Sequence, residues 1–210
     1  MTIAASSDGI VRDPEQLTRI YGSPGEQACV KEVDHVHPHY RKFIEHSPFV
    51  LLATGAAGHM DVSPRGDAPG FVRVEDEKTL LIADRRGNNR IESLRNIIAD
   101  PRIALLFLIP GIAETLRVKG TARISVKDEL LEQFEVQGRA PSSVLVIHVQ
   151  SVYFQCARAI MRSRLWDEAA RVDRSALPSI GTILADFSTS QLGGEKFDRA
   201  LQARLKATLY

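Results

Sequence analysis

The spacing of hydrophobic positions changes along this chain, and the change separates helical from extended segments. Residues 13–22 and 37–46 carry helical signals. The first segment opens with Asp13-Pro14, an N-cap residue followed by proline at the first helical position, and ends at Gly22. Helical spacing and composition also predict helices over residues 90–99, 127–134 and 156–166.

From residue 49 onward, short apolar runs separated by turn residues predict strands. About six are expected, at residues 49–53, 59–65, 80–83, 102–110, 115–125 and 144–154, and residues 71–74 are strand-like. The run at 102–110 is apolar enough to predict burial on both faces. Because the strands are joined mostly by short turns, we expect a mainly β protein with flanking helices, a six-stranded antiparallel closed or split β-barrel.

The length of 210 residues suits one domain with appendages. Residues 1–24 are expected to form a leader, loose over residues 1–12, and a short helix. Residues 25–170 would form the barrel domain and residues 171–210 a helical extension. In the extension, Phe197, Leu201, Leu205 and Leu209 recur every four residues, which predicts an amphipathic helix that docks on another surface.

Charge and composition remove several functional classes. The formal net charge of +1 argues against a nucleic-acid partner bound through a broad basic field. No apolar run reaches the roughly 18 residues that a membrane span needs, and no signal-peptide pattern is present, so we expect a cytoplasmic protein without a membrane partner. Cys29 and Cys156 are too few for a disulfide framework.

The segment Asp84 to Arg90 runs from a strand into a predicted helix and is rich in Arg, Gly and Asn. A helix N-terminus offers unpaired N–H groups and a positive dipole end, which suit a phosphate. The same residues are ordinary turn and capping residues, so a plain connection is the alternative. Three arginines within six residues favour the anion, with Arg90 at the expected helix start as its preferred partner.

Two further segments suit a planar or anionic ligand. In residues 63–67, Arg65 would supply charge and Gly66 a close backbone approach, against the alternative of a surface turn. Arg162, Arg164 and Trp166 combine charge with stacking, against the alternative of a solvated helix end.

The histidines are weaker candidates. His35, His37 and His39 alternate around a proline and fit a helix entrance better than a metal site. His148 interrupts an apolar strand and fits a core or interface histidine. The motifs of serine hydrolases, P-loop proteins, dinucleotide-binding folds and zinc proteases are absent from the sequence, so hydrolysis and phosphoryl transfer lack a candidate constellation.

These segments together resemble the pyridoxamine 5'-phosphate oxidase-like FMN-binding split barrels, and more narrowly a branch of probable FMN-dependent enzymes. The resemblance covers roughly residues 25–170. Its motifs lie at residues 47–54, 61–72, 80–88, 94–97, 105–111, 114–122 and 162–166.

The resemblance implies a six-stranded antiparallel split barrel that forms a homodimer, with FMN at the subunit interface. Ser63, Arg65 and Gly66 would lie beside the flavin ring and ribityl chain, Asn88, Asn89 and Arg90 at the phosphate, and the residue 162–166 stretch would come from the other subunit. The full implied cofactor set is Ser63, Arg65, Gly66, Asp67, Ile82, Ala83, Asp84, Asn88, Asn89, Arg90, Arg162, Ser163, Arg164 and Trp166. No metal is implied.

Two departures from the family pattern weigh against oxidation of the vitamin phosphate itself. The family's oxidases carry an Arg-x-Val-Leu-Leu-Lys strand and a C-terminal Arg-x-His pair, where this chain has residues 62–67 and Arg162-Ser163-Arg164. The resemblance therefore favours an FMN-dependent oxidoreductase of unknown substrate, with a small-molecule substrate or a nicotinamide electron donor. A flavin-holding protein without turnover, or a related barrel that uses a deazaflavin or haem, is the alternative.

Overall fold

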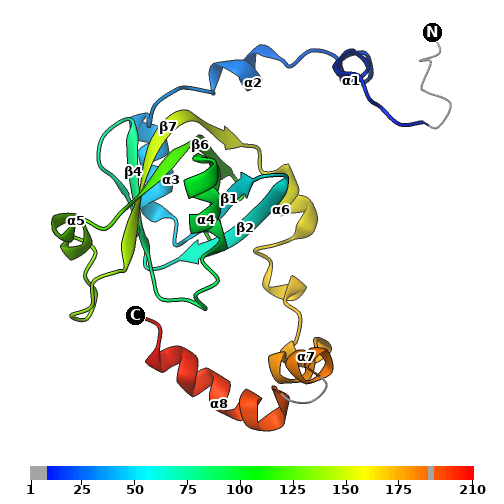
Figure 1. The fold of residues 1–210 in the computed structure, drawn as a ribbon. Coiled ribbons are helices and arrows are strands. Elements are labelled where there is room, and N and C mark those ends of the chain that lie inside the picture. Colours follow the sequence, from blue (N-terminus) through cyan, green and yellow to red (C-terminus); the bar gives the residue numbers. More distant parts are fainter. Residues whose placement is uncertain (1–8, 189–191) are drawn as a thin grey trace.

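The computed structural model describes residues 9–188 and 192–210, and it contains one antiparallel sheet with helices around it and a helical tail (Figure 1). The first eight residues of the expected leader lie outside the described residues. Within the described part of the chain, the helices are all too short or too polar to cross a membrane.

Three helices precede the sheet: α1 (Pro14–Tyr21), α2 (Glu26–Val30) and α3 (Pro38–His46). The Asp13 carboxylate accepts a hydrogen bond from the Glu15 N–H, and Pro14 follows at the first helical position, so the predicted start of α1 is confirmed. His37 caps α3 through its ring nitrogen, which accepts from the His39 N–H. The five-residue α2 was not predicted, and it buries no residue that would reveal it as apolar periodicity.

The sheet has seven strands, not six, in the order β2-β1-β5-β6-β7-β4-β3. The strands are β1 (Phe49–Ala56), β2 (His59–Gly66), β3 (Val72–Val74), β4 (Thr79–Asp84), β5 (Arg102–Leu108), β6 (Thr115–Ser125) and β7 (Ser143–Gln155). The strand beyond the six is β3, which lies within residues 71–74, described above as strand-like, and pairs with β4 over three residues. The described pairing order is open, with β2 and β3 at its two ends.

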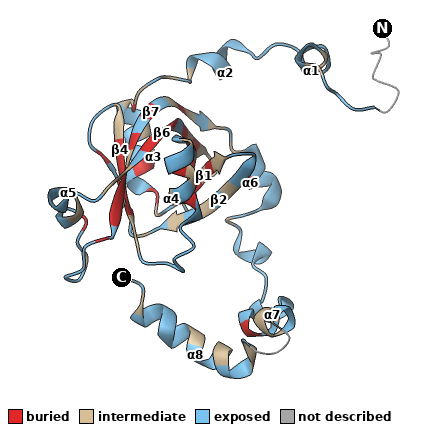
Figure 2. Cartoon of the chain, in the orientation of Figure 1, coloured by how far each residue is buried: buried red, intermediate tan, exposed pale blue. Residues whose placement is uncertain are grey.

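The larger hydrophobic cluster lies on the face of this sheet under α3 and α4 (Glu92–Ala99) (Figure 2). A smaller cluster on the opposite face of β4 and β7 packs against α5 (Asp128–Glu132) and Phe134. Val50, Leu52 and Phe107 are essentially inaccessible to solvent. The expectation that β5 is buried on both faces is wrong, because its alternate residues, Leu106 among them, are only half-buried. A strand has two faces, and helices cover only one of them here.

The predicted alternation of residues 115–125 is confirmed in β6, where Leu116, Val118 and Ala122 face inward. The pairing with β7 shifts register between Lys119 and Gly120. A Cβ atom at Gly120 would lie 2.1 Å from the backbone oxygen of His148, so only glycine allows this close approach.

After β6 come α5 (Asp128–Glu132) and α6 (Arg158–Ser163), and the tail holds two 3-10 turns (Glu168–Ala170 and Arg174–Ala176), α7 (Ile180–Phe187) and α8 (Gly194–Ala207). α7 was not predicted. It packs on α8, and the Asp198 carboxylate of α8 accepts from the Ser179 hydroxyl at 2.5 Å and the Gly181 N–H at 2.8 Å. The predicted row of apolar side chains along α8 is only partly buried against other residues, because Leu205 is 51% exposed.

Candidate functional site

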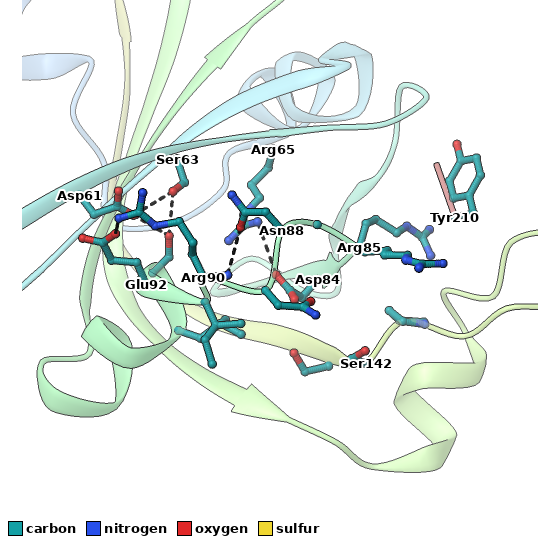
Figure 3. Close-up of a pocket in the computed structure, with 18 of the residues that line it drawn as sticks. Asp61, Ser63, Arg65, Asp84, Arg85, Asn88, Arg90, Glu92, Ser142 and Tyr210 are labelled. Carbon is teal, nitrogen blue, oxygen red and sulfur yellow. Dashed lines mark hydrogen bonds and ion pairs between the residues drawn. The ribbon is translucent and has the colours of Figure 1, made fainter. Parts of the chain in front are cut away.

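A cavity of about 860 Å³ opens between the ends of β2 and β4 (Figure 3). Its walls come from alternate residues of β2, the last residue of β4, the loop that leads to α4, the first turn of α4, residues 139–143 before β7, and Tyr210. Asp61, Ser63 and Arg65 lie on the same side of β2 because side chains of a strand alternate between its faces.

Strands β2 and β4 are far apart in the pairing order, yet their side chains meet across this cavity (Figure 3). The Arg65 guanidinium nitrogen lies 3.5 Å from an Asp84 carboxylate oxygen, and both side chains are largely buried. Burial raises the pKa of the Asp84 carboxyl, and the charge of Arg65 offsets only part of this effect. The contact places β2, at one end of the pairing order, near β4, the strand next to the other end.

A second polar cluster ties α4 to β2 at the inner end of the cavity. The Asp61 carboxylate accepts hydrogen bonds from the Ser93 hydroxyl at 2.7 Å and the Ser63 hydroxyl at 2.8 Å. The bond from Ser93, helped by Ser63 and Arg65, lowers the pKa of the Asp61 carboxyl in spite of its burial. One turn further along α4, the Asn96 amide donates to the Thr54 hydroxyl of β1.

The loop from residue 85 to 91 has an unusual backbone. Asn89 and Ile91 both have positive φ, at 58° and 50°. α4 begins at Glu92, two residues later than the predicted start at Arg90, because Ile91 adopts the left-handed conformation at the N-cap position. Ile91 supplies no side-chain cap, so the first N–H groups of α4 are left for water or a ligand.

Arg90 therefore does not lie in the first turn of the helix, as the sequence suggested. Its side chain is 76% exposed on the rim and is 3.3 Å from the Glu92 carboxylate. The Asn88 side-chain oxygen accepts from the Arg90 N–H and shapes the loop. Arg85 is occupied elsewhere, since it donates to an Asp67 carboxylate oxygen and to the backbone oxygen of Phe134.

The structure brings six of the sequence-predicted residues together around the cavity. They are Ser63, Arg65, Asp84, Asn88, Asn89 and Arg90. Gly66 and Asp67 lie just beyond the wall, where Asp67 contacts Arg85 and Tyr210. Ile82 and Ala83 are buried in β4 and do not line the cavity. They belong to two hydrophobic clusters on opposite faces of the strand.

The stretch from Arg162 to Trp166 lies on α6 and the turn after it, away from this chain's cavity. Arg164 pairs with Asp167 at 2.6 Å, and the Trp166 indole N–H donates to the Ile112 backbone oxygen. Ser163 bonds back to Ile160. The inference that this stretch serves the site of a second subunit stays a prediction.

The histidines lie outside the cavity walls. His148 is exposed on β7, so it does not lie in the core of this chain, and the alternative that it lies at an interface stays a prediction. Among residues 9–188 and 192–210, no group of three or more His, Cys, Asp or Glu side chains is arranged to hold a metal ion.

Several residues of the cavity were missed by sequence reasoning. Asp61 could have been found, because it lies two residues before Ser63 on the same face of a predicted strand. Ser93 and the residues at 139–143 carry no distinctive local pattern. Tyr210 reaches the cavity only through the path of the tail, which no local signal predicts.

The family model of pyridoxamine 5'-phosphate oxidase matches residues 36–156. This match covers more than half of the chain and runs from two residues before α3 to one residue after β7, so it includes all seven strands. The chain therefore belongs to the pyridoxamine 5'-phosphate oxidase family.

Several solved structures are similar to this chain. HupZ from Group A Streptococcus is 22% identical, with 56% of this chain and 92% of that chain covered and a TM-score of 0.46. A Clostridium acetobutylicum protein related to general stress protein 26, of the pyridoxinephosphate oxidase family, is 14% identical (56% and 85% covered, TM-score 0.44). The FAD binding protein of Mycobacterium smegmatis is 11% identical (59% and 97% covered, TM-score 0.42). A search of curated proteins finds no match.

Proposed function

We propose that this protein binds FMN in the cavity between β2 and β4 and is an FMN-dependent oxidoreductase of the split-barrel type. The observation that carries the proposal is the cavity of about 860 Å³ whose wall combines β2 side chains with an uncapped helix start. The family supports a flavin, and a similar protein from Mycobacterium smegmatis is described as FAD-binding.

The charges around the cavity fit a phosphate group. Its wall carries five arginines and three carboxylates, which leaves a formal excess of two positive charges. A phosphate monoester carries about −1.5 to −2 charges at neutral pH. The arginines are Arg65, Arg85, Arg86, Arg90 and Arg139, and the carboxylates are Asp61, Asp84 and Glu92.

The residues divide naturally between the two ends of such a ligand. The loop residues Asn88, Asn89 and Arg90, with the first N–H groups of α4, would hold the phosphate. Ser63 and Arg65 would lie beside the ring. A flavin supplies hydride-acceptor chemistry when bound, and the Arg65 guanidinium would stabilise negative charge on it electrostatically.

The finer architecture is part of the proposal. The Arg65–Asp84 contact brings strands from the two ends of the pairing order together without a hydrogen-bonded ladder, as a split barrel requires. Six strands would form its wall, with the short β3 as an appended edge strand.

A homodimer with the cofactor at its interface is also proposed. β2 lies at an end of the pairing order, and Met60 on it is 77% exposed, with Val62 exposed nearby. Ile98 and Met161 are exposed as well. Exposed apolar side chains of this kind favour association with another surface. A second subunit would also give the Arg162–Trp166 stretch a role at the neighbouring cavity.

Visible absorption of the purified protein, with mass spectrometry of whatever denaturation releases, tests the cofactor. We expect a flavin spectrum and the mass of FMN. A colourless protein that stays colourless after incubation with FMN would contradict the proposal. Flavin reduction by a nicotinamide donor, followed by reoxidation on an acceptor, separates an enzyme from a protein that only holds the flavin.

A further inference from the structure

Of the tail residues that the structure describes, a single one lines the cavity. α7 and α8 make their extended packing contacts with each other, and Leu205 and Phe187 remain exposed on them. In Figure 1 the end of the chain after α8 lies toward the sheet. Tyr210 is the residue of α8 and its end that lines the cavity.

Tyr210 is held from three separate segments of the sheet domain. Its hydroxyl donates to an Asp67 carboxylate oxygen at 2.7 Å, in the connection between β2 and β3. Its backbone oxygen accepts from the Arg139 guanidinium at 2.6 Å. Its ring lies 5.5 Å from the Arg85 guanidinium, within the range of a cation–π contact (Figure 3).

Other contacts hold the Asp67 carboxylate in position to accept the hydrogen bond from this hydroxyl. Its side chain is only 9% exposed, and Arg85 pairs with one carboxylate oxygen at 3.1 Å. The Ala68 N–H donates to the other oxygen, the one that receives the Tyr210 hydroxyl. A buried carboxylate needs hydrogen-bond donors. Loss of Tyr210 would remove one of the donors of Asp67 and leave Ala68 and Arg85.

We infer that Tyr210, through Asp67, Arg139 and Arg85, latches the tail helices against the cavity as a movable wall that controls how fast a ligand enters and leaves. We call these four residues the Tyr210 latch. The identity of the ligand as FMN rests on the proposed function, whereas the docking of the tail does not.

The wall is suited to open because little else holds it. Local opening is easiest where few buried contacts join a segment to the rest of the molecule. Among the described residues, α8 buries no side chain fully. Arg85 and Arg139 line the cavity together with Tyr210, so an open tail would uncover one side of the site and leave the β2 and loop side in place.

Two variants test the latch. Tyr210→Phe removes the hydroxyl and keeps the ring, and Tyr210→Ala removes both. Tyr21→Phe is the matched control, because Tyr21 is an exposed tyrosine of α1 outside the cavity. The first readout is amide hydrogen exchange of α8 in the FMN-free protein. We expect exchange about tenfold faster in Tyr210→Ala, with a smaller change in Tyr210→Phe and none in the control, as loss of a hydrogen bond to a charged group implies.

The second readout is the kinetics of FMN binding, followed by flavin fluorescence. A movable wall slows entry and exit together, so Tyr210→Ala should raise both the association and dissociation rates about tenfold and change Kd less. A residue that only contacts the ligand would raise the dissociation rate alone.

Unchanged exchange of α8 in both Tyr210 variants would overturn the latch, and a change confined to the dissociation rate would overturn its gating role. If the protein binds no FMN, the proposed cofactor fails, and the gating role with it. The hydrogen-exchange result then still decides whether Tyr210 docks the tail.

Discussion

The strand domain and the tail contribute to the same cavity in different ways. In the strand domain, a hydrogen-bonded sheet and fully buried side chains such as Leu52 and Phe107 fix the positions of β2 and β4. In the tail, α7 and α8 pack on each other, and Tyr210 connects them to the sheet domain. The part of the cavity wall that β2 and β4 form is therefore held by the packing of the whole sheet. The part that the tail forms is held by a few local contacts.

The largest expected effect separates the two regions by stability. Leu52→Ala removes a side chain that is 0% exposed in the core, and we expect the free energy of unfolding to fall by about 2–5 kcal/mol. Leu205→Ala, on the exposed side of α8, should change it by less than about 0.5 kcal/mol. Urea unfolding followed by circular dichroism measures both, and a comparable loss in the two variants would contradict the distinction.

The next effect concerns affinity. Arg65→Gln removes the positive charge that β2 contributes to the cavity, and we expect Kd for FMN to rise by about tenfold or more, as loss of a charge-assisted hydrogen bond implies. Arg171→Gln removes an exposed arginine of the tail outside the cavity and is the control. Fluorescence titration compares them. Equal affinities for Arg65→Gln and the wild type would remove Arg65 from the site.

A smaller effect should appear in the pH dependence of stability. Burial raises the pKa of the Asp84 carboxyl above its ordinary 3.8, with Arg65 as the opposing charge. The folded chain then binds this proton more tightly than the unfolded chain. The ionised group therefore destabilises the fold above the raised pKa, and this penalty is relieved as the pH falls through it.

Asp84→Asn cannot titrate, so its Tm relative to that of the wild type should rise as the pH rises through the pKa of Asp84. Thermal unfolding over about pH 4 to 8 measures this difference. Parallel Tm curves for the two proteins would show that Asp84 does not carry the burial penalty.

The smallest effect is the pH dependence of tail docking through Asp67. Its pKa shift has the opposite sign to that of Asp84. Burial opposes ionisation of Asp67, but hydrogen bonds from Tyr210, Ala68 and Arg85 outweigh it and hold the pKa of the carboxyl below 3.8. Its contribution is therefore fully present above pH 3.8 and is lost as the pH falls through the lowered pKa.

We expect exchange of α8, corrected for the intrinsic effect of pH, to accelerate in that acidic range. Asp67→Asn should flatten this dependence, because its side chain no longer titrates. The groups that face Asp67 are the Arg85 guanidinium and the Tyr210 hydroxyl. An equal acceleration in the variant would assign the effect to a group other than Asp67.

Sequence signals that act over a few residues predicted several helices and strands of the fold. The N-cap at Asp13, the proline at residue 38 and the alternation of β6 each act over a few residues, so they are readable without the fold. The three-residue β3 lies within residues 71–74, which are strand-like in sequence but were not counted among the six strands. The late start of α4 depends on the left-handed Ile91, a conformation that an isoleucine sequence does not suggest.

The candidate site was predicted where it follows from consecutive residues and missed where it depends on distant ones. Ser63, Arg65 and the loop at residues 84–90 were found because strand ends and helix starts have recognisable residues. Ser93 and Tyr210 enter the site through tertiary packing. Arg90 was placed correctly at the cavity but not in the helix, since its position depends on the backbone of residues 89–91.

The most direct test of the account compares the binding of FMN and riboflavin, which share a ring and differ in the phosphate. Both are titrated into the cofactor-free protein and followed by quenching of flavin fluorescence. The arrangement of the residue 88–90 loop and the start of α4 predicts that FMN binds at least about tenfold more tightly. Equal affinities, or no binding of either flavin, would contradict a phosphate site at this cavity.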